Sequence, residues 1–165
     1  MPGEQSSRFA ELIMESRAAV ERLHELWKLY MGWYTFAFTS NLLALSWAGL
    51  NPSFFSDIEQ GPLRVPATVF AALWIFINLL NLFGSVMMDF YTGRASRRIN
   101  RLLAHAYEGS DTPHDLRVQS NFPTAISRFA AQGNALSMIA FIIVWGYIFA
   151  RARGFNPDAM IERLF

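Results

Sequence analysis

The chain has 165 residues, of which 53% are hydrophobic and 16% are charged, and its formal net charge is +1. This length suits one domain, spanning 1–165, and a net charge near zero argues against nucleic-acid binding, which needs a strongly basic face. Because the chain has no cysteine, disulfides, thiol catalysis and iron–sulfur clusters are excluded. We expect no cofactor and no nucleic-acid partner.

Three stretches carry no charged residue and no histidine: 29–56, 65–88 and 129–150. Each exceeds the roughly 20 residues that a helix needs to cross the hydrocarbon core of a bilayer. Three such stretches would leave a soluble protein too little polar surface to cover them. The sequence therefore predicts an all-α integral membrane protein with three transmembrane helices, at 31–50, 65–90 and 123–151.

Residues 1–30 are predicted to form a cytoplasmic helix with a heptad-like apolar seam. No proline separates this segment from 31–50, so we expect one continuous helix. The seam continues into the first span and includes Val20, Leu23, Trp27, Tyr30, Ala37 and Ala44. It either joins copies of the chain as a coiled coil or packs on 94–108 and the start of the third helix, since a seam reports burial but not its partner.

The segment 51–64 is predicted to be an outer loop that contains a short interfacial helix. Asn51-Pro52 has the pattern of an N-cap followed by proline at the first helical position. The apolar side chains that follow are typical of an amphipathic helix at a membrane surface.

Polar side chains follow one face of the second predicted span, which should continue beyond the membrane as a helix. Asn78, Asn81, Ser85 and Asp89 recur at steps of three and four residues. An unpartnered carboxamide in hydrocarbon costs several kcal/mol, so this face should contact protein or water rather than lipid. Asn41 in the first span and Asn134 in the third are candidate supports for the same stripe.

This polar stripe has two interpretations. Its side chains either form hydrogen bonds between helices, each contributing about 0.6 kcal/mol on average, or line a hydrated path. Three helices are too few to enclose such a path, so a pore requires several copies of the chain. Asp89 at the cytoplasmic mouth would then favour cations.

The remaining segments are a cytoplasmic helix and loop at 91–122 and an outer amphipathic tail at 152–165. Ten of the 14 Lys and Arg residues lie in 1–30 and between the second and third charge-free stretches. The positive-inside rule therefore predicts a cytoplasmic N-terminus and an outer C-terminus, with a bacterial inner membrane as the expected location.

All three histidines lie outside the predicted spans. His24, His105 and His114 match no standard metal-binding spacing, and no nucleophile–base arrangement points to an enzyme. We expect no metal, a lipid bilayer as the surroundings and a homo-oligomeric ion channel or pore-like assembly as the function. The alternative is a non-catalytic accessory or scaffold subunit that docks on other membrane subunits.

Overall fold

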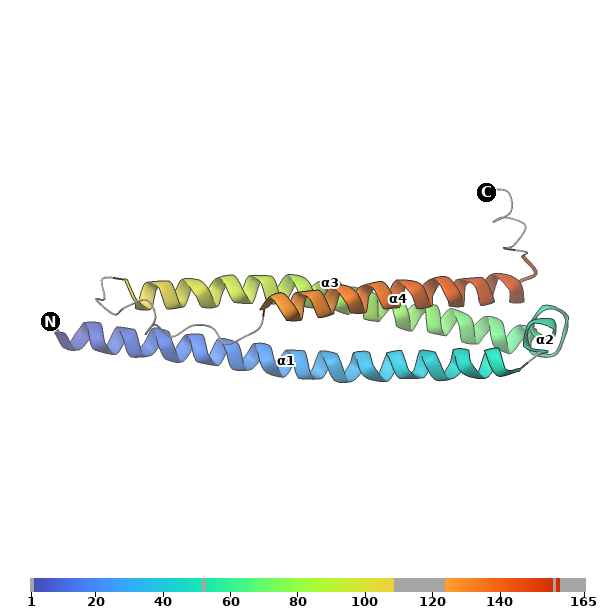
Figure 1. The fold of residues 1–165 in the computed structure, drawn as a ribbon, viewed down its shortest axis with the longest axis horizontal. Helices are drawn as coiled ribbons and strands as arrows, with labels where there is room; N and C mark the ends of the chain where they lie inside the picture. The colour runs from blue at the N-terminus through green and yellow to red at the C-terminus, as the bar shows by residue number, and fades with distance from the viewer. Residues whose placement is uncertain (1, 52, 109–123, 156, 158–165) are drawn as a thin grey trace. The chain divides into compact units, whose positions relative to one another are not determined.

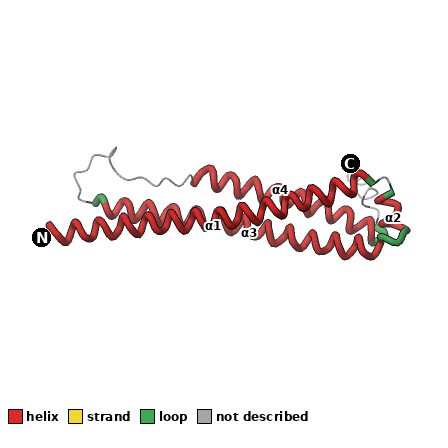
Figure 2. The backbone as a smooth tube through the Cα atoms, turned by 90° about the horizontal axis from the view of Figure 1, so that it is seen from below, coloured by secondary structure: helices red, strands yellow, loops and turns green. Residues whose placement is uncertain are grey.

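The computed structural model describes residues 2–51, 53–108, 124–155 and 157. Within these ranges the regular structure consists of four helices, α1 (Pro2–Leu50), α2 (Phe54–Gln60), α3 (Arg64–Ala106) and α4 (Thr124–Ala152), with no strand (Figures 1 and 2). The predicted all-α class is therefore confirmed. The predicted loop at 109–122, most of the tail at 152–165 and His114 lie outside the described residues.

The two long predicted helices are each continuous. α1 runs without interruption from Pro2 to Leu50 and passes through Gly32, as expected for a segment without internal proline. Its only proline occupies the first helical position, where the missing N–H would have no helical partner. α3 likewise continues from the apolar stretch through Gly93 to Ala106, so both predicted helical continuations are confirmed.

Two helices in the described part of the chain, α3 and α4, are long and apolar enough to cross a membrane. The prediction of three such helices was wrong, because α1 does not meet this test. Its segment 31–50 has no charge, but aromatic residues with polar atoms, hydroxyl groups and one carboxamide interrupt its aliphatic residues: Trp33, Tyr34, Thr35, Thr39, Ser40, Asn41, Ser46 and Trp47. Absence of charge is thus a weaker criterion for a membrane-spanning helix than high mean hydropathy.

The helix expected within 51–64 is α2, which begins at Phe54 rather than at Pro52. Ser53 is its N-cap, and the Ser53 hydroxyl lies 2.7 Å from an Asp57 carboxylate oxygen and 3.1 Å from the Asn51 side-chain oxygen. Phe54 and Ile58 are buried. α2 therefore packs one face into the protein instead of presenting all of its apolar side chains to a membrane surface.

The chain divides into two compact units. We call Met1–Met31 with Val86–Gln132 unit 1, and Gly32–Ser85 with Gly133–Phe165 unit 2. Each unit contains its own cluster of buried hydrophobic side chains.

The core of unit 1 is formed by α1, α3 and α4. Leu23 and Trp27 pack in a cluster with Ile99 and Leu103 of α3 and Ala131 of α4. Val20 and Tyr30 are partly buried against the same cluster. This part of the predicted seam thus packs within one chain, on the partners that the second interpretation of the seam named.

The core of unit 2 is rich in aromatic residues. Trp74 stacks on Trp145 with a centroid distance of 5.9 Å and an interplanar angle of 9°. Phe38 meets Phe141 edge to face at 5.4 Å. The other two seam positions belong to this unit, where Ala37 is 2% exposed and Ala44 packs partly buried against the core.

Candidate functional site

A reciprocal pair of carboxamides lies at the centre of unit 2. Asn41 of α1 and Asn78 of α3 are fully buried, and each Nδ2 donates to the side-chain oxygen of the other at 3.0 Å. Each Nδ2 also donates at 2.8 Å to a carbonyl four residues earlier in its own helix, that of Ala37 or Trp74. The pair therefore uses both N–H groups of both amides.

The third helix of unit 2 completes this network. The indole Nε1 of Trp145, on α4, donates to the Asn41 side-chain oxygen at 2.7 Å. Asn41 thus accepts from two helices while donating to its own backbone and to Asn78. A buried network in which the amides and the Trp145 indole are all paired fixes the contacts of three helices, because any shift would strand polar groups in an apolar core.

The rest of the predicted polar stripe is buried but bonds differently. Asn81 is 4% exposed and donates to the carbonyl of Ile77, and Ser85 is 1% exposed and donates to the carbonyl of Asn81. Both of these hydrogen bonds stay within α3. Asn134 of α4 is 9% exposed, and its carbonyl accepts from Ser137, whose hydroxyl also lies 2.8 Å from that of Tyr34. The structure therefore joins Asn41 to Asn78 directly and leaves the other members outside that pair.

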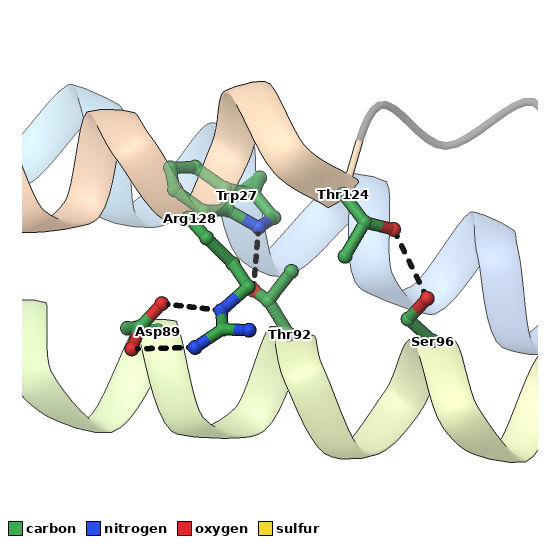
Figure 3. A network of polar contacts seen from close by, with 6 residues as sticks. All are labelled: Trp27, Asp89, Thr92, Ser96, Thr124 and Arg128. Carbon is green, nitrogen blue, oxygen red and sulfur yellow. Dashed lines mark hydrogen bonds and ion pairs between the residues drawn. The ribbon is translucent and has the colours of Figure 1, made fainter.

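Asp89, the remaining member of the stripe, forms an ion pair in unit 1. Arg128 of α4 binds both of its carboxylate oxygens, through Nε at 2.7 Å and through a terminal guanidinium nitrogen at 3.3 Å (Figure 3). Two parallel bonds of this kind match the planar guanidinium to the carboxylate. The negative charge of Asp89 is therefore balanced within the chain.

The sequence contains a signal for the pairing of Asp89 with Arg128 that helical spacing along α3 does not reveal. Asp89 is the first charged residue after the stretch 65–88, and Arg128 is the last before 129–150. When two apolar helices pack antiparallel with their charge-free stretches aligned, the residues that bound those stretches come to the same level. Opposite charges there can pair.

Two further contacts flank this ion pair in unit 1. The indole of Trp27 donates to the hydroxyl of Thr92 at 3.0 Å, and the hydroxyls of Thr124 and Ser96 lie 3.1 Å apart (Figure 3). Thr92 is fully buried. Together these contacts join α1 to α3 and α3 to α4 through side chains that sequence spacing did not connect.

Contacts of a different kind hold α2 and the start of α3 against the end of α4 in unit 2. Arg151 forms an ion pair with Glu59 of α2, and its guanidinium also donates to the Tyr147 hydroxyl. Arg64 Nε donates to the carbonyl of Ala152 at 3.0 Å. The last carbonyls of a helix have no partner in that helix, so Arg64 satisfies the end of α4.

Exposed ion pairs on unit 1 are surface features rather than a site. Arg98 lies 2.7 Å from Glu15, and Lys28 lies 2.6 Å from Glu25. The hydrogen bond and the charge of Glu25 raise the pKa of Lys28. Exposed pairs of this kind contribute little to stability, because solvent and salt screen them.

In the described ranges no group of three or more His, Asp and Glu side chains is placed to hold a metal ion. His105 Nδ1 lies 2.8 Å from the carbonyl of Arg101, one turn earlier in α3. This is local helix hydrogen bonding rather than the convergence of several ligands that a zinc site requires.

No protein-family model, no curated protein and no solved structure matches this chain.

Proposed function

We propose that this chain is an integral membrane protein that serves as a non-catalytic accessory or scaffold subunit of a larger membrane complex. In this proposal α3 and α4 cross the bilayer, and the charge-free part of α1, which is less apolar than either, crosses beside them in unit 2. The observation that carries the proposal is the buried network of Asn41, Asn78 and Trp145. These three side chains form hydrogen bonds with one another inside a single chain, so they do not line a water-filled path.

The outer surface of unit 2 supports placement in lipid. Large apolar side chains on all three long helices of this unit are more than 60% exposed: Phe36, Leu43, Phe83, Leu136 and Ile143. Soluble proteins rarely expose large contiguous apolar surface. Buried carboxamides that are paired inside the protein, with apolar side chains outside, suit a hydrocarbon solvent, which cannot satisfy backbone or side-chain polar groups. The indole N–H of Trp74 is the exception among the described residues, since it is buried without a partner.

The same geometry favours the accessory interpretation over the pore. A pore requires the stripe to face water, whereas Asn78, Asn81 and Ser85 are at most 4% exposed within a single chain. Cation preference at the mouth requires the charge of Asp89, which Arg128 balances. We therefore assign the stripe to helix packing, and the exposed apolar faces to lipid and to neighbouring subunits.

For topology we propose a cytoplasmic N-terminus and an outer C-terminus in a bacterial inner membrane. The support is the distribution of Lys and Arg, which are concentrated in 1–30 and 94–128. Positive residues flanking spans are retained on the cytoplasmic side.

The test of membrane insertion uses two arginine substitutions that a soluble protein would tolerate equally. Leu136 and Asn100 are both exposed, but only Leu136 lies inside a charge-free stretch. Leu136→Arg should cost about 2.5–3.5 kcal/mol of insertion free energy, and Asn100→Arg should cost almost nothing. The measurement is the fraction retained in membranes after an alkaline carbonate wash; equal retention of both variants, or wild-type protein in the wash, contradicts insertion.

The test of the accessory role measures particle mass and conductance for the wild-type protein. In mild detergent the chain should copurify in a complex containing other membrane subunits, and the protein alone should give no ion-selective current in a planar bilayer. A homo-oligomer that conducts ions, with a cation preference abolished by Asp89→Asn, would overturn the accessory role and establish the pore instead.

A further inference from the structure

An apolar pocket of about 330 Å³ lies in unit 2, between the last turns of α1 and α4, the first two turns of α3, and α2. Its walls include Trp47, Phe54, Phe70 and Trp145, with Ala67 as a small residue among them. The volume lies at the lower end of the range of small-molecule pockets. The pocket is partly open to its surroundings.

The lining determines what kind of molecule fits. None of the lining residues is charged, and the one buried indole N–H among them, that of Trp145, already donates to Asn41. A polar occupant would therefore lose its hydrogen bonds to water without replacement, which costs free energy. The part of the ligand inside the pocket must be apolar.

A positive charge lies next to this apolar pocket in α3. Arg64 is exposed and lies between Leu63 and Pro66, which both line the pocket. Its guanidinium is held at the end of α4 by the carbonyl of Ala152 at 3.0 Å, one turn beyond the lining residue Ile148. In the part of the chain that the structure describes, Arg64 forms no ion pair.

We propose that the pocket binds one acyl chain of an anionic phospholipid, with the headgroup phosphate against Arg64. Guanidinium groups suit phosphate because they offer several donors in one plane. The pocket also lies at the depth that such a lipid requires. Its lining residues Pro66 and Phe70 are near the start of the charge-free stretch of α3, which in the proposed orientation is where the headgroup region of the bilayer meets the acyl chains. This inference rests on the proposed membrane insertion, because the ligand comes from the bilayer.

The experiment uses full-length protein in vesicles of equal amounts of phosphatidylglycerol and phosphatidylcholine. Flotation of the vesicles is measured first, and the protein is then extracted into mild detergent for native mass spectrometry of retained lipid. We expect one phosphatidylglycerol per wild-type chain. Ala67→Phe fills the pocket and should abolish retention, whereas the matched control Ala72→Phe, at an exposed position outside the lining, should retain the lipid.

A second pair of variants tests the headgroup contact. Arg64→Gln keeps a hydrogen-bond donor for Ala152 but removes the charge, so retention of phosphatidylglycerol should fall about fivefold. The control Arg97→Gln removes an exposed arginine from unit 1 and should change nothing. Circular dichroism checks that every variant keeps its helix content; if Ala67→Phe loses helix, the Arg64 pair decides the question.

Each outcome separates the lipid site from membrane insertion. Failure of the wild-type protein to float overturns both. Flotation with equal lipid retention by Ala67→Phe and Ala72→Phe overturns the pocket alone and leaves insertion standing. Equal losses in Arg64→Gln and Arg97→Gln, or no loss in either, overturn the assignment of the phosphate to Arg64.

Discussion

Replacing Asn41 with leucine perturbs the buried network of unit 2 most directly. The substitution leaves three buried polar groups without their side-chain partner: the Asn78 side-chain oxygen, one N–H of Asn78 and the Trp145 indole N–H. An orphaned buried group costs about 1–3 kcal/mol, while hydrogen bonds between membrane helices average about 0.6 kcal/mol. Between these values we expect Asn41→Leu to reduce the free energy of unfolding by about 2 kcal/mol.

The network is asymmetric, which makes the prediction sharper. Asn78→Leu leaves the Asn41 side-chain oxygen bonded to Trp145 and its Nδ2 bonded to the Ala37 carbonyl. Only one N–H of Asn41 then loses its acceptor, so the loss should be smaller than that of Asn41→Leu, about 1 kcal/mol. The double variant leaves only the Trp145 indole N–H without a partner. Its loss of unfolding free energy should therefore be smaller than the sum of the losses of the two single variants.

The assay is reversible unfolding in mixed micelles, with helix content followed by circular dichroism as the denaturing detergent is increased. Asn100→Leu is the control, because Asn100 is an exposed asparagine of unit 1, and it should change stability by less than about 0.5 kcal/mol. The reasoning is refuted if Asn78→Leu costs as much as Asn41→Leu, or if the double variant shows simple additivity.

Three further predictions concern unit 1. Asp89→Asn should lower the unfolding midpoint, and adding Arg128→Gln should lower it little further, because the first change already removes the ion pair; a double-mutant cycle by detergent titration measures this. Thr92→Val keeps the shape of a fully buried residue but strands the Trp27 indole N–H, so the free energy of unfolding should fall by about 1–3 kcal/mol in the same titration. Gly93→Ala should raise the thermal midpoint, because alanine is the better helix former by about 1 kcal/mol and the new Cβ would meet the Arg128 guanidinium only at an ordinary contact distance of 3.8 Å.

Each of these predictions has a result that would contradict it. Additive losses for Asp89→Asn and Arg128→Gln would mean that the two side chains act independently. A Thr92→Val variant as stable as a Thr92→Ser variant, which keeps the hydroxyl, would show that the indole does not depend on this acceptor. A lower thermal midpoint for Gly93→Ala would mean that α3 and α4 approach more closely at this level than the structure has them.

Several features of this protein follow from local sequence alone. The length of α1 follows from the absence of proline after Pro2, and the apolar character of α3 and α4 follows from charge-free stretches with high hydropathy. The short helix before α3 was also predictable, although its first residue was not, because Ser53 rather than Asn51 is the N-cap. Such features depend on neighbours a few residues apart, which the sequence displays directly.

The partner of each polar side chain was decided only by the tertiary structure. Sequence spacing placed Asn78 and Asp89 on one helix face, yet the fold pairs the first with Asn41 and the second with Arg128. The same holds for Trp27 of the seam, which packs inside its own chain and bonds to Thr92. The physical reason is that periodicity reports which face of a helix is buried, whereas the identity of what covers that face depends on how helices far apart in the chain align.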